Sequence, residues 1–246
     1  MISLLGLMET AIGSACGALG GAYCLWVINR KKEHEKTLSD INYVLAVLIA
    51  HMHSLLNFKK QHALPFCEEM DRLIDVLDND PAQAKNKEIA VEAHKIFISV
   101  VEADYNIEGL LEKLAPHTAA DTKAILLAMK VMEALSCVKD ITLMRNQMIV
   151  GVENMAVPTE KKLSYVLGKI SVNGKTDTRF VDATRGLLSN VDISLHFIDL
   201  LIPRVQNIGR QILPASYAKR IADKDFAQSL EMLIPPKDFI DGWMDG

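Results

Sequence analysis

The chain has 246 residues, of which 50% are hydrophobic and 24% are charged, and its formal net charge is −4 at pH 7. A hydrophobic share this high excludes disorder over most of the length. The mild negative charge, without a long basic block, argues against a nucleic-acid partner, and none is expected. The 4 cysteines form neither a disulfide framework nor a paired metal-ligand spacing, which fits a reducing compartment.

The first predicted element is an apolar helix at the N-terminus. Residues 10–28 contain no charged side chain. At about 1.5 Å per residue this run approaches the roughly 30 Å thickness of the hydrocarbon core of a bilayer. A secretory signal would carry positive charge before the apolar run, whereas Glu9 is the only charged residue among the first nine. We therefore expect residues 1–29 to form a retained transmembrane anchor.

The end of this run has the composition of a membrane interface. Aromatic rings favour the boundary between lipid and water, and an excess of Lys and Arg marks the cytoplasmic side. The predicted interface residues are Tyr23, Trp26, Arg30, Lys31 and Lys32. They predict a single-pass protein with its N-terminus outside and its C-terminal domain in the cytoplasm, in contact with membrane lipid, and the membrane we favour is the bacterial inner membrane.

Small residues recur on one face of the predicted anchor. Gly13, Gly17 and Gly21 are spaced by four, and Ser14 and Ala18 widen the face. Such a face lets a second helix backbone approach closely, which predicts a homo-oligomer or contact with another membrane protein. The alternative is that small residues are simply common in membrane helices.

A second apolar segment follows within residues 30–62. We expect a helix over about 37–58 that is buried on several sides, because residues 43–50 are apolar nearly all round. A second membrane crossing at 41–58 is the alternative. It would place Asn42, His51 and His53 in or near lipid, which is costly.

The remaining chain predicts a helical bundle in two parts, residues 63–157 and 158–246. In the first part, Pro65 is expected to end the preceding helix and open an amphipathic helix to about residue 77. Asp80-Pro81 is expected to start a helix that continues, with a kink, to Leu114. A capping box at Thr118 and Asp121 then predicts one or two long helices over residues 119–155 of an antiparallel bundle.

Prolines divide the second part. A short helix is expected over 158–168, a turn or hairpin tip at Asn173-Gly174, and a long helix from about 178 that stops at Pro203. The C-terminal tail, residues 239–244, is apolar enough that we expect it to dock on the protein itself rather than on a partner.

One stretch resembles a phosphate-binding loop in its final residues, Gly174, Lys175 and Thr176. Five residues separate Gly174 from Gly168, whereas the loop needs four so that successive N–H groups wrap the phosphates. The alternating strands of a nucleotide-binding sheet are also missing. Nucleotide binding is therefore a weak candidate, and the sequence predicts no cofactor and no metal.

Together these patterns predict an all-α protein with an N-terminal transmembrane helix and a cytoplasmic bundle of several helices. The function we expect is that of a non-enzymatic scaffold, sensor or membrane effector that assembles through its anchor. The alternative is a membrane-tethered enzyme whose site lies inside the bundle and is built from residues distant in the chain.

Overall fold

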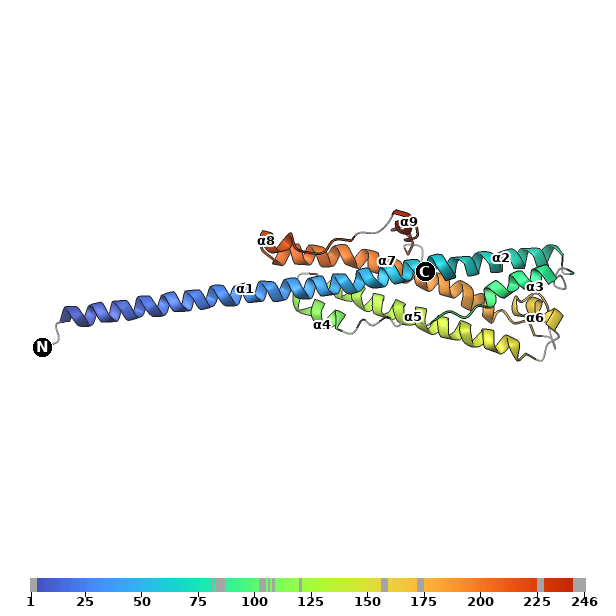
Figure 1. The fold of residues 1–246 in the computed structure, drawn as a ribbon, viewed down its shortest axis with the longest axis horizontal. Coiled ribbons are helices and arrows are strands. Elements are labelled where there is room, and N and C mark those ends of the chain that lie inside the picture. The colour runs from blue at the N-terminus through green and yellow to red at the C-terminus, as the bar shows by residue number, and fades with distance from the viewer. Residues whose placement is uncertain are drawn as a thin grey trace.

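The computed structural model describes residues 4–240 except 81, 83–86, 102–104, 106, 108, 120, 156–158, 172–174 and 225–227. For residues 4–18 and a few others beside these gaps it describes the backbone alone. Over the described part the chain is helical without strands, which confirms the predicted all-α class. Figure 1 shows a long helix that protrudes from an elongated bundle, with the N-terminus at its free end. Whether this helix enters a membrane stays a prediction.

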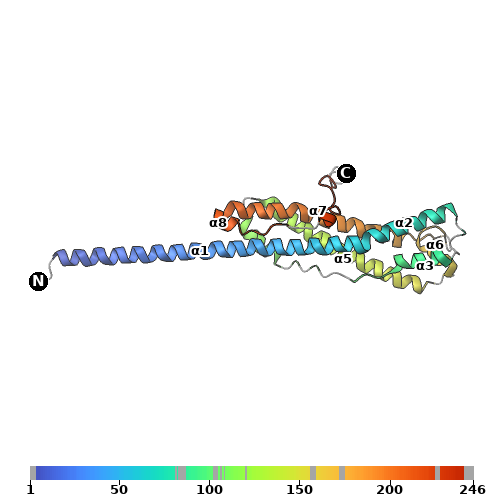
Figure 2. The same ribbon diagram turned by 45° about the horizontal axis from the view of Figure 1, so that its top comes forward.

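The protruding helix and the predicted second helix are one element, α1 (Leu4–Phe58). The sequence predicts separate helices on either side of the charge-rich residues 30–36, but the helix runs through them unbroken. These Lys, Arg and Glu residues are good helix formers, and nothing among them caps or breaks a helix. The first half of α1 therefore projects as a direct extension of its second half (Figures 1 and 2).

The predicted break at Pro65 is also wrong. A short π-helix, η1 (Lys59–Ala63), joins α1 directly to α2 (Leu64–Asn79), with Pro65 in the first turn of α2. The Leu64 N–H donates to the Lys59 carbonyl, the wider spacing of a π-turn. Proline lacks a donor and its ring crowds the preceding turn, so a local change of helix type absorbs the mismatch that would otherwise end the helix.

Three long helices build the larger core. The second half of α1 packs against α7 (Arg179–Ile212), and α7 packs along α5 (Thr122–Glu153). Figure 1 shows that α7 runs in the opposite direction to α1 and α5, as predicted for an antiparallel bundle. Side chains with 0% exposure include Ile41, Leu48, Met52, Ala128, Val131, Leu187, Leu195 and Leu201. Residues 41–58, for which a second membrane crossing was the alternative, thus lie in the centre of a protein core.

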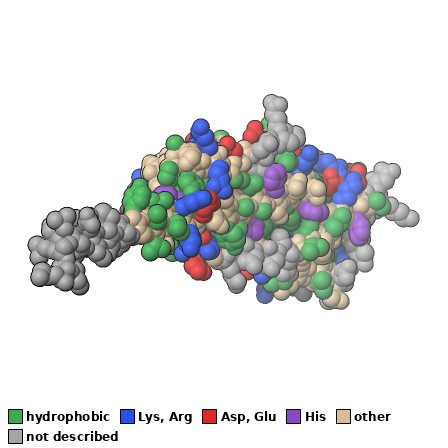
Figure 3. All heavy atoms as spheres, turned by 60° about the vertical axis from the view of Figure 1, so that its left-hand side comes forward, with side chains coloured by type: hydrophobic (Ala, Val, Ile, Leu, Met, Phe, Trp, Pro, Cys, Tyr) green, Lys and Arg blue, Asp and Glu red, His purple; other side chains and the backbone are tan. Residues whose placement is uncertain are grey.

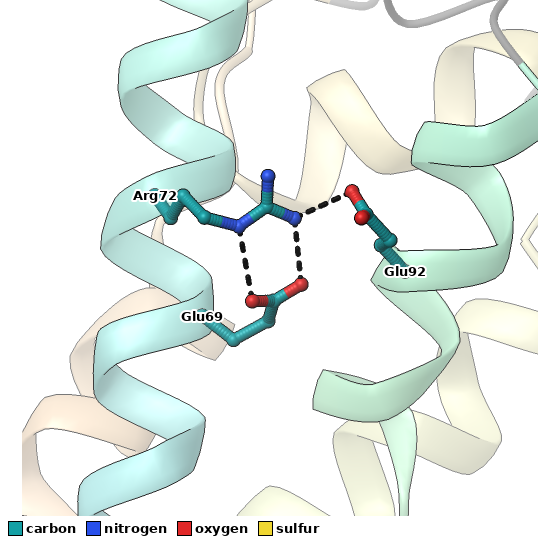
Figure 4. A network of polar contacts seen from close by, with 3 residues as sticks. All are labelled: Glu69, Arg72 and Glu92. Carbon is teal, nitrogen blue, oxygen red and sulfur yellow. Dashed lines mark hydrogen bonds and ion pairs between the residues drawn. The ribbon is translucent and has the colours of Figure 1, made fainter.

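A second core cluster occupies the end of the bundle far from the N-terminus. It combines α2 with α3 (Lys87–Ala93), the 3-10 helix η3 (His94–Phe97), α6 (Thr159–Val166) and the adjoining ends of α5 and α7. Met70, Leu73 and Ile96 are completely buried in it. On its surface, Arg72 of α2 donates to Glu69 (2.8 Å) and to Glu92 of α3 (2.6 Å), as Figure 4 shows. Because these groups are solvated, this network orients α3 more than it stabilises it.

Shorter helices complete the bundle. They are α4 (Leu110–Leu114), the 3-10 helix η4 (Ala115–His117), α8 (Ala215–Ala218) and α9 (Gln228–Glu231). The helix predicted to continue to Leu114 is interrupted after Phe97, where Ile98 turns extended. Gly109, with φ of +80°, lets the chain re-enter a helix at α4.

Two further boundaries differ from the prediction. The N-cap of α5 is Asp121 alone, whose carboxylate accepts from the Lys123 N–H, while Thr118 bonds to the Ala115 carbonyl instead of forming a capping box. α7 continues through Pro203 to Ile212. Apolar residues on both sides of Pro203, such as Leu201 and Val205, are completely buried, and this packing outweighs the lost backbone hydrogen bond.

The C-terminal segment returns to the body, as predicted for its described part. The ring of Phe239 lies 6.0 Å from that of His196 on α7. The last residues of the predicted tail, 241–244, lie outside the described residues.

We expect Asp40 to stabilise the contact between α1 and α4. Asp40 is 6% exposed, and its carboxylate lies 3.0 Å from Lys113 Nζ and 3.4 Å from His117 Nε2. Burial alone would raise the pKa of Asp40, but the hydrogen bonds to Lys113 and His117 lower it overall. Asp40→Asn should lower the free energy of unfolding at pH 7 by about 1–2 kcal/mol.

The pH dependence of that effect checks its cause. Because the folded-state pKa of Asp40 is depressed, its contribution is present above its unfolded pKa of about 3.9 and is lost as the pH falls through the folded value. Urea unfolding of the detergent-solubilised protein at neutral and acidic pH measures this, with Asp140→Asn on the exposed face of α5 as control. An Asp40→Asn loss that is the same at every pH would contradict the assignment.

Candidate functional site

The protruding helix is apolar and exposed from Leu19 to Ile28. Leu19 is 72% exposed and Ile28 is 49% exposed, although both would be buried in an ordinary globular domain. Exposure continues through Glu33, and the first buried position is Leu38. An uninterrupted apolar surface of this kind marks a site that lipid or another helix covers.

The predicted helix-packing face is open where the structure describes it. Gly21 has no atom within 4 Å of the position that a Cβ would occupy, and the same holds for Gly20. Gly13, Ser14, Gly17 and Ala18 lie on the same continuous helix, but the surroundings of their side chains are outside the described residues. The body therefore does not use the described end of this face, and self-association through it stays a prediction.

Three of the predicted interface residues, Tyr23, Trp26 and Arg30, form a ladder along one side of α1. The rings of Tyr23 and Trp26 stack with centroids 5.9 Å apart, and the guanidinium of Arg30 lies 5.0 Å above the Trp26 ring. Lys31 and Lys32 follow in an exposed stretch. Apolar ring surface thus gives way to cationic surface within two turns, the arrangement that suits the boundary between lipid tails and headgroups.

Within the part of the chain that the structure describes, length and composition alone select two helices that could cross a membrane. One is the continuous helix that contains α1, and the other is α7. The apolar side chains of α7 fill the core, with Leu187, Val191 and Ile198 at 0% exposure. Exposure therefore distinguishes the two, since only the first half of α1 presents its apolar residues outward.

The structure does not support the weak phosphate-loop candidate at Gly174, Lys175 and Thr176. Gly174 lies outside the described residues, and Lys175 and Thr176 are exposed between α6 and α7. Asp177, which follows them, already accepts a hydrogen bond from the Arg179 N–H at the start of α7 (3.1 Å). A phosphate at this helix end would meet a carboxylate in place of a free donor, which disfavours binding.

The main polar feature inside the body is Arg145 of α5, which sequence reasoning missed. This side chain is 0% exposed. Its guanidinium donates to the Ile96 and Ile98 carbonyls and to the Thr184 hydroxyl, and it lies 4.1 Å from the centre of the Phe66 ring. Burial lowers the pKa of Arg145 to about 10, so the group remains charged at neutral pH.

The neighbouring Asn146 completes this contact with the extended chain after η3. Its side-chain amide donates to the Val100 carbonyl (2.7 Å) and accepts from the Val100 N–H (3.1 Å). Arg145 and Asn146 therefore satisfy backbone groups of residues 96–100 that a helix would otherwise satisfy internally. The sequence signal that could have revealed this site is Arg145 itself, because a cation stands in the apolar stripe of α5 between the buried residues Val138 and Val152.

Partly buried polar groups also hold elements together. Lys59 at the start of η1 lies 2.6 Å from Asp192 of α7 and donates to the Leu233 carbonyl (2.7 Å). Burial raises the pKa of Asp192, against the opposing effect of Lys59. Burial, assisted by the positive charge of Arg145, lowers the pKa of His62. Among the described residues, no three His, Cys, Asp or Glu side chains are placed to hold a metal ion.

Comparison with known proteins gives no further guide to the site. No protein family matches the chain, and no curated protein or solved structure is significantly similar to it. The functional argument therefore depends on the geometry described above.

We expect Arg145→Ala to destabilise the body strongly. The substitution leaves the buried Ile96 and Ile98 carbonyls without donors and removes packing against Phe66, at a cost of about 3–5 kcal/mol. Urea unfolding of the solubilised protein measures this loss. Lys139→Ala on the exposed face of the same helix is the matched control. Equal midpoints for the two variants would show that the guanidinium contributes nothing.

Cys67 should behave as an inert buried thiol. Burial, together with the charge of Asp71, raises its pKa to about 11, and the thiol donates to the Thr184 carbonyl. Only about 0.1% is thiolate at pH 8, compared with about a quarter of an ordinary thiol with a pKa near 8.5. In a variant that keeps Cys67 as its only cysteine, reaction with a soluble disulfide reagent should become at least about hundredfold faster once urea unfolds the body. Rapid reaction in the folded state would contradict this placement.

Proposed function

We propose that the protein is a single-pass membrane protein that assembles through its N-terminal helix and presents its helical body as a scaffold or sensor in the cytoplasm. The observation that carries this proposal is the bare apolar half of α1, which is exposed from Leu19 to Ile28 and continuous with the core helix of the body. Exposed apolar surface of this length in water favours aggregation, so a bilayer is the environment that suits it.

The orientation follows from the charges that come next. Arg30, Lys31 and Lys32 lie between the apolar segment and the body, and positive flanks remain on the cytoplasmic side. This supports a body in the cytoplasm, with the bacterial inner membrane as the membrane we favour. A cysteine introduced at Asn79 would test on which side of the membrane the body lies. Labelling of this cysteine by a membrane-impermeant maleimide in intact cells would show that the body lies outside, opposite to the orientation proposed here.

The phase of α1 supports self-assembly. At 3.6 residues per turn, Ser39, Ala46 and Ala50 point within about 60° of the direction of Gly17, and all three are exposed on the body. Val44 and Leu48, which point roughly the opposite way, are completely buried. The glycine face thus points to a side of α1 that is exposed at these three positions, while Glu35 and Asn42 on the same side contact Arg220 and Ala222. Pairing of two anchors is therefore expected along the part of α1 that precedes the body.

A structural role also fits the polar groups of the interior. Arg145 and the Lys59–Asp192 pair use their hydrogen bonds to join α5, α7 and η1 to neighbouring segments. No arrangement among the described residues favours the alternative of a membrane-tethered enzyme. Because α1 enters the core without a hinge, a rotation or displacement of the anchor would be transmitted directly to these contacts.

The assembly test uses Gly17→Ile. The larger side chain should hold the anchors apart and convert a detergent-solubilised oligomer into a monomer, as measured by sedimentation or native mass spectrometry. Ala15→Ile is the matched control, because residue 15 points about 160° away from Gly17. Both variants should stay in the membrane pellet after carbonate extraction. Full-length protein that is soluble without detergent would refute the anchor, and an unchanged mass for Gly17→Ile would refute this assembly face.

A further inference from the structure

The structure fixes how far the body lies from the end of the anchor. The rings of His34 on α1 and Tyr217 on α8 are 5.5 Å apart, and Arg220 lies 3.2 Å from Glu35. These contacts place α8 beside residues 34–35 of α1. Figures 1 and 2 both show α8 at the end of the body nearest the N-terminus.

Under the proposed anchoring, residues 34–35 of α1 and the adjacent α8 lie at the membrane surface. His34 follows Ile28 by six positions, which is about 9 Å along a helix. The headgroup layer extends about 5–7 Å beyond the hydrocarbon, and screening at physiological salt acts over about 8 Å. α8 and the end of α7 would therefore lie within electrostatic reach of lipid headgroups.

The end of the body that carries α8 is positively charged, whereas the whole chain has a negative net charge. Residues 30–36 carry four Lys or Arg and two Glu, and residues 210–220 add three Lys or Arg and no acidic residue. The complete chain has a net charge of −4. Figure 3, which brings this end forward, shows Lys and Arg side chains with a few acidic ones around the base of the protruding helix. Such a surface attracts an anionic leaflet by about 1 kcal/mol per basic residue near it.

A pocket lies within this basic end, between the end of α7 and the chain around α8. Its volume is about 480 Å³. Leu213, Ala218 and Ile221 line its apolar part, while Arg210, Lys219 and Asp223 supply its charged groups. Arg210 lies 3.4 Å from Asp223 at an exposed position, so this contact is weak, and Lys219 is exposed. Two cations beside apolar side chains match a phosphate joined to the glycerol and first methylenes of a lipid.

We propose that this pocket, named here the α7–α8 pocket, binds the headgroup of an anionic phospholipid from the leaflet next to the body, with Arg210 and Lys219 on its phosphate. The inference depends on the proposed membrane anchoring, because α1 is what holds the pocket at the bilayer. Binding there fixes the body against the membrane surface at a second point besides the anchor.

The test uses full-length protein in nanodiscs, with a fluorophore on Ser216→Cys in α8 and alanine at Cys16, Cys24 and Cys137. A quencher on the lipid headgroups reports contact with the bilayer. Replacing about a third of a neutral phosphatidylcholine bilayer with phosphatidylglycerol should increase quenching at least about twofold, and about tenfold higher salt should reverse the increase. The same fluorophore on Asn79→Cys, at the far end of the body, should not respond.

Charge variants identify the pocket. Arg210→Gln with Lys219→Gln should abolish the phosphatidylglycerol-dependent quenching, whereas the matched pair Lys139→Gln with Lys161→Gln, both exposed and far from α8, should leave it intact. Urea unfolding midpoints show whether each pair is folded. If the Gln pair at the pocket unfolds the body, Lys219→Gln alone, at an exposed position, should still reduce the response.

The outcomes separate the two proposals. Protein that does not enter nanodiscs refutes the anchor itself. Protein that enters but shows equal quenching in neutral and anionic bilayers, or an unchanged response in the pocket variants, refutes the lipid site alone. Loss of the response on addition of soluble glycerol phosphate would show a general anion site and would overturn the assignment to lipid.

Discussion

The continuity of α1 is the constraint on which the rest of the structure depends. A single helix carries the exposed apolar surface of residues 19–28 and the completely buried residues Ile41, Leu48 and Met52. The backbone is therefore helical both where α1 is exposed and where it is buried, and only the surroundings of its side chains differ. Because no loop separates the two halves, the packing of the body sets the direction and phase of the first half of α1, and the helix rise sets the distance from residue 28 to the level of α8.

The interior of the body is organised around a cation that no carboxylate neutralises among its described hydrogen bonds. Arg145 is stabilised by carbonyl groups, a hydroxyl and aromatic faces. Desolvation of a guanidinium is costly, and the cost is offset because the same group supplies donors to backbone carbonyls that have left the helix. Arg145 thus explains why the chain after η3 is extended in the middle of an otherwise helical body.

Apolar periodicity predicted the helical class and much of the buried surface, but not all the helix boundaries. The crowded apolar residues 43–50 predicted burial, and Val44, Leu45 and Leu48 are completely buried. Prolines were less reliable as signals for helix ends. The helix continues past Pro65 because a π-turn accommodates it, and past Pro203 because the surrounding side chains are tightly packed. The interruption after Phe97 could not be predicted, since it depends on Arg145, which lies 48 residues further along the chain. The α7–α8 pocket likewise joins residues that only the fold brings to the level of His34.

The two proposed membrane contacts lie at different levels of α1. His34, which packs against Tyr217 of α8, follows Gly21 by 13 positions, which is about 20 Å along the helix. Pairing of two anchors through Gly13, Gly17 and Gly21 therefore does not use the stretch of α1 that α8 covers. Lipid contact at α8 would in turn restrain rotation of α1 about its own axis, since α1 and the body turn together. A rotational restraint of this kind favours one face of the anchor for pairing, so lipid binding and assembly are expected to strengthen each other.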